Sequence, residues 1–510
     1  MGTITWTFVV GAITLVMTYI GIRLYRYLKW LRYVHKTLSK LPGPKPHWLF
    51  GNIFQIGNFS EFHYKCHEEF IVQKKVKIYV FWLSTFFPTV MLAHPDTIKE
   101  VMRSNSPKPT VGPGYPFLVP WLGQSLLLSN GAKWERNRRL LTPAFHFSIL
   151  TGYFKIYNEV TDVLMDKLAT MCEKRKYIDI FKPASMATLD TLLQCALGYK
   201  GDVQQVGEHH PYVYSKSELN LGFQHSGERS TLEYIHHYPE FIYRYLTANG
   251  REFFKLCDYV HKFSKDIIST RRKELNESKE TEKKKHLDFL DILITAKDDN
   301  GVGLTDDEIR SEVDTFLFAG HDTTSCLLSW SMYCLGKFKD IQNKVYQEIK
   351  QVIGTKNTVD SEDLANLRYL TCFLKEVMRL HSPVSIVNRM LDQPVVTNGV
   401  EIPAGILIDL GIYHAQNHPD VWQNPTEFRP ERFEGDKHHE MDPYSFTPFS
   451  AGPRNCIGMN FAQNEEKVMI ARIIKRFEVS LDPDHVVEPF MEVVLRAKTG
   501  IMVNFKERDL

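Results

Sequence analysis

Hydrophobic residues recur at three- and four-residue spacing through most of the chain, the period of an α-helix with one buried face. Runs of strand length that are alternating or continuously apolar are fewer and shorter. The helical runs cover residues 153–171, 253–275, 309–338, 341–353, 370–380 and 465–477, and the strand-like runs cover 76–82, 89–93 and 406–410. This pattern predicts a mainly α-helical domain with a small β subdomain.

The N-terminal segment follows a different pattern, because residues 1–22 carry no charge and residues 4–22 are largely apolar. About 20 such residues can cross a bilayer as a helix. Basic residues follow at positions 23, 26, 29, 32, 36 and 40, which keeps that flank in the cytosol. A cleaved signal peptide is the alternative, but its charges would precede the apolar core and a small-residue cleavage site would follow it.

We therefore expect a single-pass transmembrane anchor at residues 1–22 and a basic, proline-rich linker at 23–46. The main domain is expected at residues 47–510, because no second linker interrupts it. The orientation of the anchor predicts the endoplasmic reticulum membrane, with the main domain in the cytosol.

Composition excludes some classes of function. The 62 basic and 60 acidic residues leave a net charge of +2, which gives no sign of a nucleic acid partner. The eight cysteines contain no CxxC pair, which argues against a disulfide framework and a structural zinc site. Most of them are expected to be buried, reduced thiols.

One predicted helix is unusually long and carries polar residues at its centre. Thr305 and Glu308 fit a capping box, so the helix begins there and runs for about thirty residues. Its middle contains residues 319–324, Ala-Gly-His-Asp-Thr-Thr. A glycine beside an acid and hydroxyls disfavours a plain buried helix. We expect a kink at Gly320 and a functional site beside it.

A single cysteine, Cys456, follows a loop with glycine and proline and lies just before a predicted helix. Free N–H groups and the helix dipole at such a position lower the pKa of a thiol, and the thiolate is the form that ligates iron. Arg454, two residues earlier, suits a carboxylate such as a heme propionate. Taken alone, a cysteine near a helix start is more often a buried structural thiol.

The surrounding residues favour ligation. Phe449, Gly452, Arg454, Cys456 and Gly458 resemble the heme-binding loop of the cytochrome P450 superfamily at five positions. The resemblance spans nearly the whole chain and implies the helical fold of that superfamily. It also implies that Cys456 ligates the iron of heme b, in a monooxygenase that inserts one atom of O2 into a C–H bond.

Two further stretches resemble a structural network of the same superfamily. Glu376 and Arg379 match its E-x-x-R helix, and one helical turn places them on the same face. Arg432, in the Pro-Glu-Arg-Phe stretch 430–433, matches the arginine that completes the network. The three are interpreted as a buried structural triad that supports the heme loop and takes no part in the chemistry.

The resemblance also supplies candidates for holding the heme propionates. Trp134 and Arg138 lie one helical turn apart and match the propionate-binding helix of the superfamily. Arg389 matches another propionate contact.

The middle of the long helix then lies over the distal face of the heme. Asp322 and Thr323 match the acid–alcohol pair that delivers protons to bound oxygen. The alternative is that Thr323 only bonds back to a helix carbonyl.

The chain has no convincing dinucleotide-binding motif, because Gly301 and Gly303 lie in a loop without a third glycine. Electrons must then come from a partner, which in this superfamily is an NADPH-dependent flavoprotein reductase, sometimes with cytochrome b5. Lys133, Arg136 and Arg139 are candidates for the docking face, and an ordinary solvated surface is the alternative.

Residues 312–324 and 134–147 look most like the fatty-acid ω-hydroxylase branch, which implies a long-chain fatty acid or eicosanoid oxidised at or near its terminal methyl. Many members esterify their heme through a glutamate where this chain has Ala319, so no such ester is expected here. This departure weakens the ω assignment. Phe316, Ala319 and Ser385 are the candidate substrate contacts.

Other functions remain open for this fold. An isomerase or dehydratase acting on hydroperoxides would need no proton delivery, and an anchored heme carrier or sensor would show no turnover. His414 and His418, four residues apart, are interpreted as surface or structural histidines, because no cysteine or carboxylate set accompanies them.

Overall fold

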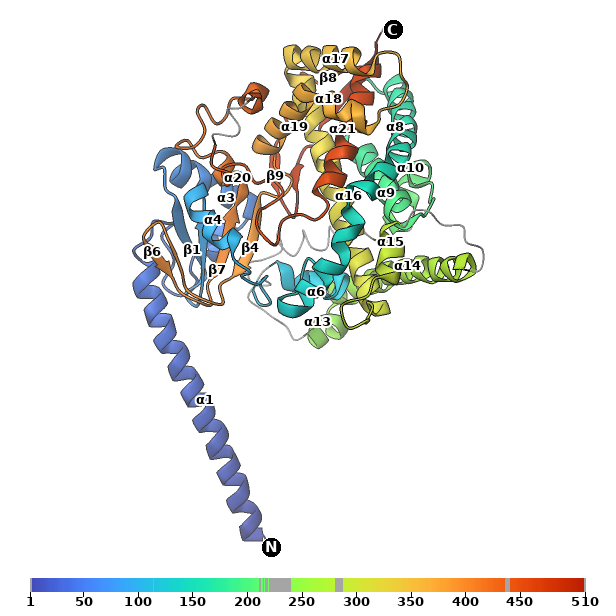
Figure 1. Cartoon of the computed structure of the whole chain (residues 1–510). Coiled ribbons are helices and arrows are strands. Elements are labelled where there is room, and N and C mark those ends of the chain that lie inside the picture. The colour runs from blue at the N-terminus through green and yellow to red at the C-terminus, as the bar shows by residue number, and fades with distance from the viewer. Residues whose placement is uncertain are drawn as a thin grey trace.

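A projecting N-terminal helix and a globular body make up the computed structural model of this chain (Figure 1). The structure describes residues 2–112, 114–210, 212–213, 215, 219, 240–279, 288–435 and 441–508. Helix α1 (Gly2–Leu38) leaves the body beside the sheet subdomain. Its segment Val9–Leu38 is long and apolar enough to span a membrane, with a mean hydropathy of 1.3.

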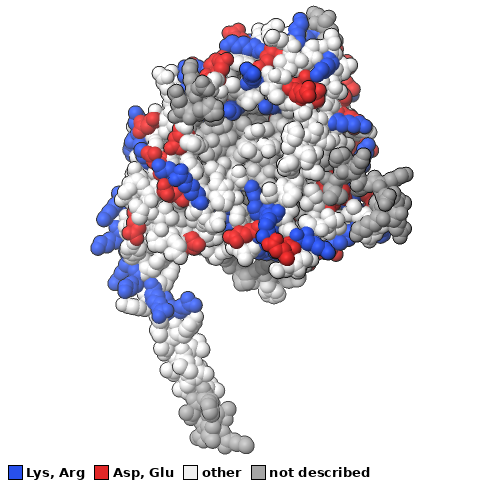
Figure 2. Space-filling model, in the orientation of Figure 1, with Lys and Arg blue, Asp and Glu red and all other residues white. Residues whose placement is uncertain are grey.

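The charged residues after position 22 belong to this helix. Within the predicted linker at 23–46, residues 23–38 are helical and continue α1, and the proline-containing part is not helical. Val34 and Leu38 are fully buried in the cluster beneath the sheet, and the indole Nε1 of Trp30 donates to the carbonyl oxygen of Ala404 at 3.1 Å. These contacts attach the helix to the body. Figure 2 shows basic side chains gathered where it meets the body.

The largest sheet has the strand order β1-β2-β7-β4, from β1 (Ile78–Ser84), β2 (Phe87–Leu92), β7 (Leu407–Gly411) and β4 (Ile386–Met390). Strands β2 and β7 are parallel, and Val90 lies opposite Ile408 with both side chains fully buried. The three strand-like runs of the sequence thus form strands, as predicted, and the structure places these strands next to one another. The remaining strands are β3 (Ile178–Asp179), β5 (Val395–Thr397), β6 (Val400–Ile402), β8 (Phe477–Leu481), β9 (Pro489–Met491), β10 (Leu495–Ala497) and β11 (Met502–Glu507).

Helices form most of the body, which confirms the predicted class. The predicted runs correspond to α8 (Phe154–Lys174), α14 (Ala248–Lys279), α16 (Asp306–Lys337), α17 (Lys339–Ile353), α19 (Arg368–Leu380) and α21 (Met459–Arg476). Shorter or additional helices are α2 (Ile53–Ile56), α3 (Phe59–Cys66), η1 (His67–Gln73), α4 (Pro95–Arg103), α5 (Tyr115–Leu122), α6 (Gly131–Leu141), η2 (Thr142–Phe145), α7 (Phe147–Leu150), η3 (Thr151–Tyr153), α9 (Phe181–Leu197), α10 (Val203–Val206), η4 (Gly207–His209), α13 (Glu240–Leu246), α15 (Phe289–Thr295), α18 (Ser361–Asn366), α20 (Ile412–Gln416) and η5 (Pro430–Phe433).

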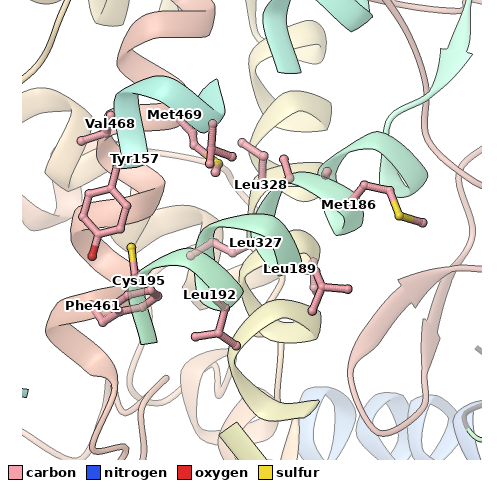
Figure 3. Packing of buried hydrophobic residues seen from close by; sticks show 14 of the residues in the cluster. Tyr157, Met186, Leu189, Leu192, Cys195, Leu327, Leu328, Phe461, Val468 and Met469 are labelled. Atoms are coloured by element: carbon pink, nitrogen blue, oxygen red, sulfur yellow. The ribbon is translucent and has the colours of Figure 1, made fainter. Parts of the chain in front are cut away.

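Helix α16 crosses the body and is the centre of the main core. It begins at the predicted capping box, in which the Thr305 hydroxyl accepts from Glu308 N–H and the Glu308 carboxylate accepts from Thr305 N–H. Leu327 and Leu328 of α16 pack near Leu189 and Leu192 of α9 (Figure 3).

Helix α16 continues through Gly320 from Asp306 to Lys337, so the glycine does not interrupt the helix, and a kink there stays a prediction. Packing explains the glycine. A Cβ at position 320 would lie 2.8 Å from the Leu192 side chain, so glycine lets α9 and α16 approach closely. Thr188 of α9 also donates to the carbonyl oxygen of His321 at 3.0 Å, which ties the two helices together at this point.

Candidate functional site

The loop that carries Cys456 is shaped by its own backbone. The N–H of Cys456 donates to the carbonyl oxygen of Phe449 at 2.9 Å, and the N–H of Asn455 donates to that of Gly452 at 3.1 Å. Gly452 has φ +72°, and a Cβ there would collide with the carbonyl oxygen of Met102 in α4. Only glycine allows the loop to lie this close to α4.

Cys456 is exposed, whereas the other seven cysteines are buried or half-buried. Burial among protein atoms nevertheless raises the pKa of its thiol, and the N–H of Gly458 and the charge of Arg138 only reduce this effect. The predicted lowering of the pKa is therefore wrong in its net direction, since desolvation outweighs the helix terminus. A bound metal ion would stabilise the thiolate form of this cysteine.

A group of cations lies beside the cysteine loop. Lys108 and Arg389 are buried, with 8% and 2% of their surface exposed, and Arg454 is half-buried. Among the described residues none of the three forms an ion pair with a carboxylate. The Nζ of Lys108 donates to the Tyr115 hydroxyl at 2.8 Å, and the Nε atoms of both arginines are buried without an acceptor.

These cations perturb one another. Burial, with the charges of Arg389 and Arg454, holds the pKa of Lys108 well below its usual range. Burial and the charge of Arg389 lower the pKa of Arg454 to about 10. An uncompensated buried cluster of this kind needs an anion. The two carboxylates of heme meet that need, so the residues present fit the cofactor that the resemblance implies.

Helix α6 supplies the other two predicted heme contacts. The guanidinium of Arg454 lies 4.4 Å from the centre of the Trp134 ring, which places this tryptophan against the cation group. Arg138 instead reaches the cysteine loop, where its Nη1 and Nη2 donate to the carbonyl and side-chain oxygens of Asn455 at 2.9 and 2.8 Å. A propionate contact of Arg138 stays a prediction.

The predicted triad comes together in the core. Arg379 donates from Nε and Nη2 to the two oxygens of Glu376 at 2.8 and 2.9 Å, and Arg432 Nε donates to the same carboxylate at 3.3 Å. Glu376 and Arg379 are fully buried and Arg432 is 9% exposed. Arg379 also donates to the carbonyl oxygen of Gln416, whose side chain accepts from the N–H of Thr447. The triad is thus connected to the chain just before the cysteine loop.

Asp322 and Thr323 point to different sides of α16. Asp322 is 3% exposed, and its Oδ1 lies 3.4 Å from Nε2 of His321 and 3.5 Å from Nη2 of Arg496. Thr323 is half-buried, and its hydroxyl donates to the carbonyl oxygen of Ala319 at 2.7 Å. This is the bond of the alternative interpretation, and it leaves the hydroxyl able to accept a further hydrogen bond.

One face of α16 remains only half-buried although the helix lies in the core. Phe316, Ala319, Gly320 and Thr323 form this face, whereas the residues around them on the same turns are buried. Their spacing of three, four and seven residues defines a single stripe. The stripe is apolar except for the hydroxyl of Thr323, which suits contact with an apolar molecule or a flat cofactor.

The structure gives two of the predicted substrate residues other contacts. The ring of Phe316 packs against Phe145 and Phe289, with centroid distances of 5.4 and 4.5 Å. Ser385 is 8% exposed, and its hydroxyl donates to the carbonyl oxygen of Ser382 at 3.4 Å. Ala319 is therefore the best placed of the three predicted contacts.

The candidate docking residues are neutralised by a segment that is distant in sequence. Each pairs with a carboxylate of residues 298–308, so together they do not form a free basic face. Lys133 Nζ lies 3.4 Å from Glu308, Arg136 Nε lies 2.7 Å from Asp298, and Arg139 Nη1 lies 2.7 Å from Asp299.

Known proteins match this chain along nearly its whole length. The family described as Cytochrome P450 matches residues 41–505. Cytochrome P450 4B1 of Rattus norvegicus is 36% identical over 499 residues, which are 97% of this chain and 95% of that protein. The ultra-long-chain fatty acid omega-hydroxylase of Homo sapiens is 35% identical, over 94% and 91% of the two chains. The taurochenodeoxycholic 6 alpha-hydroxylase of Sus scrofa is 36% identical, over 95% and 94%.

The range matched by the family includes all the parts of the chain that form the candidate site. The matched range contains the cysteine loop, the long helix and the triad. The family implies heme, and the exposed sulfur with its neighbouring cations accommodates it. The chain belongs to the cytochrome P450 family and is a heme-dependent monooxygenase.

Proposed function

We propose that this monooxygenase hydroxylates a long-chain fatty acid or an eicosanoid at or near its terminal methyl. The observation that carries the proposal is the half-buried stripe of Phe316, Ala319 and Thr323 in the middle of a buried helix. A narrow apolar chain can cover this stripe without leaving a polar group unpaired. The name of one relative, a fatty acid omega-hydroxylase, supports the same substrate class.

Heme would be held by Cys456 through iron and by Arg389, Arg454 and Lys108 through its carboxylates. When bound, heme supplies the activation of O2 that no side chain can perform. The cation group would fix the orientation of the cofactor, because its positive charge lies on one side only.

Asp322 and Thr323 would deliver the protons that the reaction needs. The buried carboxylate of Asp322 is held by His321 and Arg496, so its position is fixed before substrate enters. The Oγ of Thr323 can accept a hydrogen bond from water while it donates to Ala319. It can transfer a proton only by turning away from that carbonyl, which keeps proton transfer under geometric control.

Ala319 determines how the cofactor is retained. A methyl group cannot form an ester, so heme b is held at this position only by packing. The methyl group also leaves more space above the stripe than a glutamate would, which would let a chain bind at more than one depth. Oxidation near the terminus as well as at it is therefore part of the proposal.

The partners follow from the family and from the anchor. A reductase that passes electrons from NADPH, and in some cases cytochrome b5, would dock on the cytosolic side of the endoplasmic reticulum membrane. Helix α1 would span that membrane, consistent with its exposed apolar surface.

The test is product analysis with the full-length protein, its reductase, NADPH, and a panel of dodecanoate, hexadecanoate, arachidonate and a taurine-conjugated bile acid. Terminal or near-terminal hydroxy acids that require NADPH are expected. A hydroxylated bile acid as the main product would contradict the proposed substrate class. The bile acid is included because one relative is named a taurochenodeoxycholic 6 alpha-hydroxylase. Conversion of a fatty acid hydroperoxide without NADPH would favour an isomerase or dehydratase, and heme binding without any turnover would favour a carrier.

A further inference from the structure

A buried glutamate near the start of α16 has no role in the chemistry described so far. Glu312 is fully buried, and its two oxygens both accept from the N–H of Leu126 at 3.0 Å. One of them also accepts from the amide Nδ2 of Asn137 at 3.0 Å. No cation pairs with Glu312 among the described residues, so its carboxylate is satisfied by two segments of the chain and not by a salt bridge.

The first segment is a turn. Ser129 N–H donates to the carbonyl oxygen of Ser125 at 2.8 Å, so a contact at residue 126 also fixes residue 129. Thr315, one helical turn after Glu312, donates to the Ser125 hydroxyl at 2.6 Å and holds the same turn.

Residues at the end of this turn bind two members of the cation group. Arg454 donates to the carbonyl oxygen of Ser129 at 3.2 Å and to Oδ1 of Asn130 at 3.0 Å. Asn130 also exchanges hydrogen bonds with the backbone of Lys108, at 2.7 and 3.0 Å. Two of the three cations beside the cysteine loop therefore take their positions from residues 129 and 130.

The second segment is α6. Asn137, which donates to Glu312, is fully buried and directly precedes Arg138. Arg138 in turn donates twice to Asn455, the neighbour of Cys456. Glu312 is thus connected by two routes to Arg454 and Asn455, the two residues that directly precede Cys456.

We propose that Glu312 is a positioning residue for heme, because its carboxylate holds the two segments that carry the partners of Arg454 and Arg138. The inference rests on heme binding and on the cation group described above. It does not depend on the substrate.

The test measures heme dissociation from the holoprotein to an excess of apomyoglobin. Both carboxylate oxygens accept from the N–H of Leu126, so in Glu312→Gln the amide NH2 faces that N–H in either orientation of the amide. The contact to the turn is weakened, and the negative charge that the turn shares with Asn137 of α6 is lost. We expect heme to dissociate about tenfold faster or more, as for other groups that support a metal ligand. The thiolate-type spectrum of the reduced carbon monoxide complex should also decay faster.

Asp314→Asn is the matched control. Asp314 is fully buried on the same helix, but its carboxylate accepts from Arg310 and from Ser264 of α14, away from the cysteine loop. This variant should lower the thermal midpoint and leave the rate of heme dissociation unchanged. Equal acceleration in both variants would show that Glu312 acts only through general stability and would overturn the inference.

Asn130→Ala provides a second test if Glu312→Gln does not accumulate as a folded protein. It keeps the glutamate and removes the side-chain bonds of Asn130 to Arg454 and Lys108, so faster heme loss is again expected. If heme dissociates from the variants at the rate of the parent protein, the role of Glu312 is overturned and the proposed function is unaffected. If the parent protein binds no heme, the proposed function is overturned.

Discussion

Arg496 Nη2 lies 3.5 Å from Oδ1 of Asp322, which joins strand β10 to the middle of the long helix. The arginine also lies 4.3 Å from the centre of the Phe181 ring, and its Nε is 3.5 Å from Glu492. Asp322 is nearly inaccessible, but the side chain of Arg496 is 24% exposed. This pair is therefore the connection from the buried acid toward solvent.

Replacing Arg496 with Gln should reduce the fraction of NADPH electrons recovered in product by a few-fold, because Asp322 loses its cationic partner. The measurement is product and hydrogen peroxide formed per NADPH. Arg496→Lys keeps the charge and should retain most of the coupling. If Arg496→Gln forms as much product per NADPH as the parent protein, Arg496 has no part in proton delivery.

Replacing Thr323 with Ala should leave heme content unchanged and lower product formation roughly 100-fold, as for loss of a proton-transfer group. The electrons should appear as hydrogen peroxide. Thr323→Ser keeps the hydroxyl and is the control. Normal coupling in Thr323→Ala would support the alternative that the hydroxyl only bonds to Ala319.

Heme should be removed completely from the native protein by extraction with acidified organic solvent, because Ala319 cannot form an ester. Chromatography of the denatured protein, monitored at heme and protein absorbance, separates free heme from polypeptide. Ala319→Glu introduces the missing carboxyl and should retain part of the heme after turnover. Heme that stays with the native polypeptide would disprove this prediction.

Glu376→Gln should lower the free energy of unfolding by about 3 to 5 kcal/mol, because two buried arginines lose their shared counter-charge. Chemical denaturation of the holoprotein measures it. Lys344→Gln breaks a pair with Glu431 whose lysine is 57% exposed, and it should cost less than about 1 kcal/mol. Similar losses in the two variants would contradict the structural role of the triad.

Stability should depend on pH through a cluster of buried histidines beside the sheet. Burial lowers the pKa of His63 to about 3 and that of His67 to about 4, and burial with the neighbouring histidines holds the pKa of His414 well below its usual range. Among the described residues, neither ring nitrogen of His63 has a hydrogen-bond partner. Below an ordinary pKa of about 6.5 the unfolded chain binds protons that the folded chain does not, so stability falls as pH falls from 6.5 toward 4.

His63→Gln removes one of these groups without changing the others. The free energy of unfolding of the parent should fall more steeply than that of the variant, by about 1.4 kcal/mol per pH unit in this window. Denaturation at pH 5 and pH 7 measures the difference in slope. Parallel slopes would show that His63 is protonated in the folded protein.

Local sequence determined the helices and the cysteine loop. Periodic apolar positions and the capping box at Thr305 marked α16 because both signals lie within a few residues of each other. Glu376 and Arg379 could be paired from their spacing, since one helical turn brings them together. The five matching positions around Cys456 identified the family before any contact was known.

Other features depended on contacts between distant segments. Lys108 is an ordinary lysine between two prolines in the sequence, and only its burial beside Arg389 and Arg454 makes it a candidate for the heme site. Glu312 likewise has partners 175 and 186 residues away. The candidate docking residues likewise have counter-ions in residues 298–308, which their own sequence neighbours do not show.

The sequence by itself therefore determined the family, the candidate ligand Cys456 and the order of the helices. Only the tertiary structure decided that Gly320 serves packing against Leu192 and that desolvation outweighs the helix terminus at Cys456. The physical reason is the distance along the sequence over which each interaction acts. Helix periodicity and capping act over a few residues, whereas burial, ion pairing and the pKa of a group depend on segments that meet only when the chain is folded.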